Sequence, residues 1–111
     1  MKEAMVTAAG ETLYPDDIEP HYSSALFAEH CVVPMAGADG NDVPTLIVVP
    51  SRADVADAEI DRAVAELRRA APARFRIPRF VRHDAPLPRT AIGKLRRRAL
   101  AAEVSLAHAR H

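Results

Sequence analysis

The 111-residue sequence contains no tryptophan, one cysteine and only four glycines. A single cysteine cannot form an internal disulfide, so we expect Cys31, which lies in an apolar stretch, to be a small buried side chain of a reducing compartment. No apolar run approaches the roughly 20 residues that a membrane helix needs, and the first four residues lack the long apolar region of a secretory signal. These absences predict a cytoplasmic location and no membrane segment.

Metal-ligating residues are also sparse. The five histidines show no metal-ligand spacing with the one cysteine, so we expect no metal site in this chain. Hydrophobic residues make up 49% and charged residues 27% of the sequence, which is the composition of a globular domain and argues against disorder. Since a chain of this length has room for one modest core, we treat residues 1–111 as one domain.

The net charge is zero, but the charges are unevenly distributed. Residues 1–67 contain 13 acidic and 3 basic side chains, whereas residues 68–98 contain 11 basic side chains and Asp84 as their one acid. A cationic C-terminal third suits a polyanion such as a nucleic acid, an anionic membrane or a nucleotide with several phosphates. A solvated arginine-rich face without a ligand explains the same charge equally well.

Periodicity and breaker residues predict an α+β domain: a small mixed three-stranded sheet with flanking helices and an N-terminal hairpin or loop. Pro20 is expected early in the first helix, where its missing hydrogen-bond donor costs least. The expected helices cover residues 15–28 and 55–71 and begin again near Lys94. The expected strands cover residues 31–33, 45–49 and 79–83, with a hairpin or tight loop at 4–14, a turn at 36–42 and a loop at 84–93.

The clearest of these helices is the one at residues 55–71, because apolar side chains recur on one face. Asp54 is the expected N-cap, and Pro72 is expected to end the helix. The apolar stripe consists of Ile60, Ala63, Val64, Leu67 and Ala71.

Lys94 interrupts a run of arginines, since thirteen of the fifteen basic residues are arginine and the other lysine is Lys2. An ammonium group is a compact point charge that suits a place between several oxygens, whereas guanidinium is a planar fork. Gly93 beside it permits a tight turn or a close approach. Lys94 is therefore a candidate functional residue, and a solvated lysine at a helix start is the alternative. The arginines at 96–98 are expected to form a solvated helix face or to contact another domain.

Three stretches then occur in a fixed order: residues 6–19 read VTAAGETLYPDDIE, residues 75–79 read FRIPR, and residues 88–98 read PRTAIGKLRRR. They are similar to three segments of the acyl-adenylating superfamily of acyl-CoA synthetases, nonribosomal peptide synthetase adenylation domains and luciferases. Those segments are a glycine loop before Tyr-Pro-x-x-Ile-Glu, a Phe/Tyr-Lys-x-Pro-Lys stretch and a closing glycine-lysine motif. Together with Lys2 the matches span residues 2–98. The chain thus resembles the small C-terminal domain of such an enzyme.

The resemblance implies a role in a two-step reaction. In this family a large N-terminal domain binds ATP, Mg²⁺ and a carboxylic acid, and the small domain closes over it twice. In the first closure the lysine matching Lys94 offsets charge repulsion as the carboxylate attacks the α-phosphate, which gives an acyl-adenylate and pyrophosphate. A well-placed charge of this kind contributes roughly 3 kcal/mol to a transition state.

In the second closure the domain rotates. The residues matching Ala9 and Gly10 then line a tunnel through which the pantetheine thiol of coenzyme A, or of a carrier protein, reaches the adenylate. Phe75 and Arg79 match residues that contact the nucleotide of coenzyme A in some ligases, so that Phe75 would stack on adenine and Arg79 would pair with phosphate. The alternative places Phe75 in the core and Arg79 on the surface. Lys2 matches the hinge of the family, or is a solvated chain end.

The ATP-binding half of such an enzyme is missing, because no Ser/Thr/Gly-rich phosphate loop ending in Lys-Gly occurs. We therefore expect no catalysis by this chain alone and a large adenylation domain as its partner, in cis or in trans. A start at the hinge favours an excised domain over a natural stand-alone protein. Two alternatives remain: a nucleic-acid-binding module that uses the arginine-rich third, and a non-catalytic regulatory or docking domain of the same fold. The first is disfavoured because only Phe75 and Phe80 offer aromatic rings there.

Overall fold

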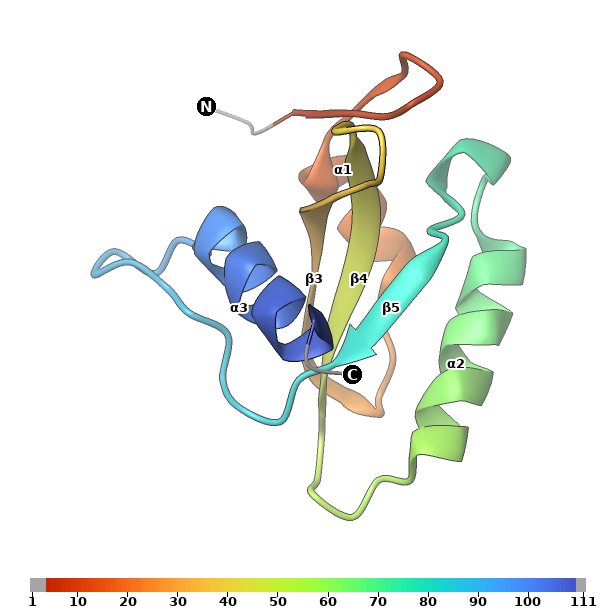
Figure 1. Cartoon of the computed structure of the whole chain (residues 1–111). Coiled ribbons are helices and arrows are strands. Elements are labelled where there is room, and N and C mark those ends of the chain that lie inside the picture. Colours follow the sequence, from red (N-terminus) through yellow and green to blue (C-terminus); the bar gives the residue numbers. More distant parts are fainter. Residues whose placement is uncertain (1–3, 110–111) are drawn as a thin grey trace.

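The computed structural model describes residues 4–109. Two short strands, β1 (Met5–Val6) and β2 (Thr12–Leu13), form an antiparallel hairpin. A separate sheet has the strand order β3–β4–β5 (Figure 1). In it β3 (Phe27–Ala36) runs antiparallel to β4 (Asp42–Pro50), and β4 runs parallel to β5 (Arg79–Arg82). The predicted α+β class, with a mixed three-stranded sheet and an N-terminal hairpin, is confirmed.

Helices cover both faces of this sheet. The short α1 (Pro15–Ile18) continues into a 3-10 turn, η1 (Glu19–Tyr22). The crossover from β4 to β5 contains α2 (Asp57–Ala70) and a second 3-10 turn, η2 (Ala73–Phe75). The chain then passes through a long loop into α3 (Arg97–Ala109). No helix within residues 4–109 is long and apolar enough to cross a membrane.

The core has two layers because side chains alternate between the two faces of β3 and β4. Val32 of β3 faces α1 and α2, while its neighbours Cys31 and Val33 face α3. The thiol of Cys31 is fully buried, and burial, aided by the negative charge of Glu19, raises its pKa to about 12. The expected buried cysteine is therefore confirmed.

The first predicted helix is wrong in its length. It was expected to reach residue 28, but α1 ends at Ile18 and η1 ends at Tyr22. Pro20 has no N–H to donate to the carbonyl of Asp16, so the α-helical ladder stops and a tighter 3-10 turn replaces it. The chain then extends into β3, which begins at Phe27, earlier than the expected strand.

The ends of the other helices also differ from the prediction. Ala56 takes the N-cap place of α2 instead of Asp54, and the Glu59 carboxylate accepts a hydrogen bond from the Ala56 N–H at 3.2 Å. Asp54 instead accepts a hydrogen bond from Arg52 at 3.1 Å. The last helix begins at Arg97 rather than near Lys94, because the residues before it are held in a hairpin-like turn.

Candidate functional site

Lys94 lies at the end of a tight turn. The Gly93 N–H donates to the Thr90 carbonyl at 2.9 Å, and the Thr90 N–H donates to the Lys94 carbonyl at 2.8 Å. Gly93 has a φ of 86°, which favours glycine, and Arg89 and Leu95 pair across the base of the turn. The Lys94 side chain is exposed and has no hydrogen bond or ion pair with any described residue. The turn thus presents a free ammonium group.

The predicted thiolation loop has the same construction. The Gly10 N–H donates to the Thr7 carbonyl at 2.9 Å, and the Thr7 N–H donates to the Glu11 carbonyl at 3.0 Å. Gly10 has a φ of 80°, so both turns are three-residue hairpin loops closed by a glycine in the left-handed region. A Cβ built at Gly10 would meet nothing within 4 Å. Within this chain glycine is therefore required for its backbone conformation rather than for space.

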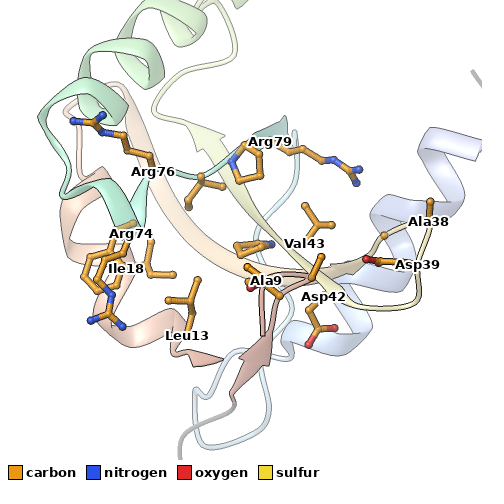
Figure 2. Close-up of a pocket in the computed structure, with 17 residues that line it drawn as sticks. Ala9, Leu13, Ile18, Ala38, Asp39, Asp42, Val43, Arg74, Arg76 and Arg79 are labelled. Carbon is orange, nitrogen blue, oxygen red and sulfur yellow. The ribbon is translucent and has the colours of Figure 1, made fainter. Parts of the chain in front are cut away.

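A cavity of about 530 Å³ lies beside the Gly10 turn. Figure 2 shows Arg74 and Arg79 at its edges, with Ala9 and Val43 between them. The cavity brings together Ala9, Phe75 and Arg79, three of the predicted site residues, whereas Gly10 and Lys94 do not line it. Its wall comes mainly from the β1–β2 hairpin, the β3–β4 turn with the start of β4, and residues 74–79 from η2 to the start of β5, and Ile18 of α1 completes it.

Phe75 is held in the cavity wall by a buried tyrosine. The Tyr22 hydroxyl donates to the Phe75 carbonyl at 2.6 Å and accepts from the Ile77 N–H at 3.0 Å. The half-buried ring of Phe75 packs against the core and lies 5.0 Å from the guanidinium carbon of Arg74. Phe75 is therefore both a side chain at the edge of the core and a cavity-lining residue.

Arg79 differs from the other two arginines of the cavity. Arg74 lies 3.8 Å from the carboxylate of Glu11, and Arg76 donates to the Ala71 carbonyl at 3.2 Å, where it satisfies the end of α2. The Arg79 side chain is exposed and has no hydrogen bond or ion pair with a described residue. It is the cavity arginine best placed to receive an anion.

Arg97 departs from the solvated face expected for residues 96–98, whereas Arg96 and Arg98 are exposed. Only 8% of Arg97 is exposed. Its Nη2 lies 2.9 Å from both carboxylate oxygens of Glu19, and its Nε donates to the Val32 carbonyl at 3.2 Å. Because Glu19 also accepts from the Val32 N–H at 2.7 Å, the pair satisfies both backbone groups of Val32 on edge strand β3. A structural role of Arg97 replaces the predicted exposure.

The segregation of charge along the sequence is explained by pairing within the fold. Five arginines of the cationic stretch lie within 4 Å of a carboxylate of residues 1–67, at distances from 2.8 to 3.8 Å. The four pairs other than Arg97–Glu19 each have a well-exposed partner and contribute between 0 and about 1 kcal/mol, so they shape the surface more than they stabilise it. The pairs are Arg74–Glu11, Arg82–Asp57, Arg89–Glu29, Arg97–Glu19 and Arg98–Asp42.

Two predictions remain to be placed. Lys2, the expected hinge residue, lies outside the described residues. Among the side chains that the structure describes, those of residues 4–105, no group of three or more histidine, cysteine, aspartate or glutamate residues is arranged to hold a metal ion.

The sequence matches no protein family and no curated protein sequence. Solved structures share its fold, at identities that support the fold alone. A fatty acyl CoA synthetase from Mycobacterium tuberculosis is 22% identical at a TM-score of 0.72, covering 94% of this chain and 20% of its own. An o-succinylbenzoate CoA synthetase from Bacillus subtilis is 25% identical at a TM-score of 0.70, and the match covers 92% of this chain and 20% of that one. An anthranilate CoA ligase in complex with anthranoyl-AMP is 20% identical at a TM-score of 0.74, and the match covers 95% of this chain and 20% of that one.

The chain therefore spans about a fifth of the length of these ligases. The likeness covers most of this chain and agrees with the resemblance to the C-terminal domain of the acyl-adenylating superfamily.

Proposed function

We propose that this chain is the mobile C-terminal domain of an AMP-forming acyl-CoA synthetase-like ligase. It would supply the lysine for adenylation and the loop for thiolation to a large domain that binds ATP. The observation that carries the proposal is the free, exposed Lys94 on a tight turn of a fold shared with acyl-CoA ligases. The whole reaction belongs to the two domains together.

In the first step Lys94 stabilises charge. A substrate carboxylate attacks the α-phosphate of ATP, and pyrophosphate leaves. The ammonium group lies between carboxylate and phosphate oxygens and offsets their repulsion, which requires a charge that is not already neutralised by a partner. The absence of a described acid beside Lys94 meets that requirement.

In the second step the Gly10 turn and its cavity receive the thiol donor. The thiol of coenzyme A or of a phosphopantetheine carrier loses its proton and attacks the acyl carbon of the adenylate, so that a C–S bond forms and AMP leaves. Ala9 supports this step by lining the passage rather than by taking part in the chemistry. The Phe75 ring and the unpaired Arg79 side chain support binding of adenine and phosphate.

The nucleic-acid alternative has less support than the sequence alone offered. Five arginines of the cationic stretch are paired with carboxylates, so their charge is not presented as a continuous basic stripe. The rival proposal is a docking domain with no part in catalysis, and the experiment below distinguishes the two.

The test measures both half-reactions in the enzyme that contains this chain and its large domain. Lys94→Ala should reduce adenylate formation at least about 100-fold and leave thioester formation from supplied acyl-adenylate unchanged. Arg62→Ala, which removes an exposed charge on α2, is the control and should leave both rates unchanged. Equal rates of adenylation for the wild-type and Lys94→Ala enzymes would reject the proposed role of Lys94.

A further inference from the structure

Glu29 of β3 contacts the loop that carries Lys94 at two points. Its Oε2 accepts a hydrogen bond from the Leu87 N–H at 3.1 Å, and its Oε1 accepts one from Arg89 Nη2 at 3.0 Å. Both carboxylate oxygens are thus occupied by a single loop. Burial works to raise the pKa of Glu29, but the Arg89 guanidinium and the Leu87 N–H outweigh it and lower the pKa overall.

Arg89 extends this contact to the lysine turn. While Nη2 binds Glu29, Nη1 donates to the Gly93 carbonyl at 3.0 Å. That carbonyl belongs to the peptide that joins Gly93 to Lys94. A continuous path of hydrogen bonds therefore runs from β3 through Glu29 and Arg89 to the backbone next to Lys94.

We infer that Glu29 and Arg89 are positioning residues that hold the Lys94 turn in place before any nucleotide binds. Guanidinium suits this task because its rigid fork reaches two acceptors at once, whereas a lysine ammonium at position 89 is a point charge. The sheet supplies the fixed reference, since Cys31 and Val33 on the same strand are fully buried. That Glu29 and Arg89 hold the turn in place does not depend on the proposed function. The effect of the turn on catalysis does rest on the proposed function of Lys94.

The first experiment measures amide hydrogen exchange on the 111-residue chain. Arg89→Lys and the isosteric Glu29→Gln should each speed exchange of the Thr90 and Gly93 amides by about tenfold or more, while amides of β4 and α2 stay unchanged. Arg96→Lys, an exposed conservative change nearby, is the matched control and should have no effect. Unchanged protection at Thr90 and Gly93 in both folded variants would overturn the inference.

The second experiment connects the turn to chemistry in the two-domain enzyme. Arg89→Lys should lower kcat of adenylation about tenfold to 100-fold, because small displacements of a catalytic charge have effects of this size. KM for ATP and thioester formation from supplied adenylate should stay unchanged. One outcome is that Arg89→Lys loosens the turn while neither Arg89→Lys nor Lys94→Ala lowers kcat of adenylation. The proposed function then fails, and the conclusion that Glu29 and Arg89 hold the turn in place is kept. If Lys94→Ala is damaging but a loosened turn leaves kcat unchanged, the positioning role in catalysis is refuted.

Discussion

Replacing Arg97 by methionine tests the largest disagreement between sequence and structure. The side chain of Arg97 is 10% exposed and that of Glu19 is 17% exposed, so the substitution removes one member of a mostly buried ion pair. Removing one partner of a buried pair typically costs 3–5 kcal/mol, because the other charge stays buried without compensation. Glu19 keeps its hydrogen bond from the Val32 N–H. We therefore expect the lower end, a loss of about 3 kcal/mol in the free energy of unfolding.

Urea unfolding followed by circular dichroism measures this loss. Arg96→Met is the matched control and should change stability by less than about 0.5 kcal/mol, as exposed substitutions usually do. The double variant Arg97→Met with Glu19→Leu removes both charges and should recover a large part of the loss. A cost below about 1 kcal/mol for Arg97→Met would mean that Arg97 is a solvated surface residue.

The remaining predictions concern the site and the core. Gly10→Leu should lower the free energy of unfolding by roughly 1–2 kcal/mol, because the φ of Gly10 is 80°. Ala9→Leu lacks that strain and should block thioester formation while adenylation persists. A normal rate of thioester formation in folded Ala9→Leu would show that Ala9 does not line the thiol passage. Acetylation of Lys94 should reproduce the adenylation defect of Lys94→Ala by removing the charge, and full activity of an acetylated sample would refute it. The pKa of Glu29 is lowered from 4.5 in the fold, so the stability difference between wild type and Glu29→Gln should be present above about pH 4.5 and vanish as the pH falls through the folded pKa; a difference independent of pH would contradict this sign. Cys31, with a pKa of about 12, should resist iodoacetamide at pH 8 in the folded chain and react in concentrated urea, as followed by mass spectrometry.

The sequence predicted correctly those elements in which apolar residues recur with a single helical or strand period. The stripe containing Ile60 and Val64 marked α2, and both side chains are buried. The expected strand at 31–33 was too short, since Glu29 and His30 interrupt the apolar pattern of β3. Those polar side chains are satisfied by partners outside β3: Glu29 by Arg89, 60 residues away, and His30, whose Nε2 lies 2.8 Å from the Glu19 carbonyl. Contacts of this kind cannot be read from local periodicity.

The same reasoning explains which site residues were found. The glycines of the two turns could be predicted from the sequence, because a left-handed φ favours glycine at that position. Arg97 was missed because one arginine among several looks solvated and its partner Glu19 lies 78 residues away. A signal was nevertheless present: Arg97 precedes Leu100 and Val104 by three and seven residues, which places it on the buried stripe of α3.

The two turns share their hydrogen bonds and differ in how each is joined to the sheet. The Lys94 turn is joined to β3 through Glu29 and Arg89. The Gly10 hairpin is joined to β4 through Asp42, whose carboxylate accepts from the Val6 N–H at 3.2 Å and lies 3.7 Å from Arg98 at the start of α3. Both turns therefore take their position from neighbouring strands of one sheet. Under the proposed function a rotation of the whole chain would replace one turn by the other at a common partner, with no change inside the chain.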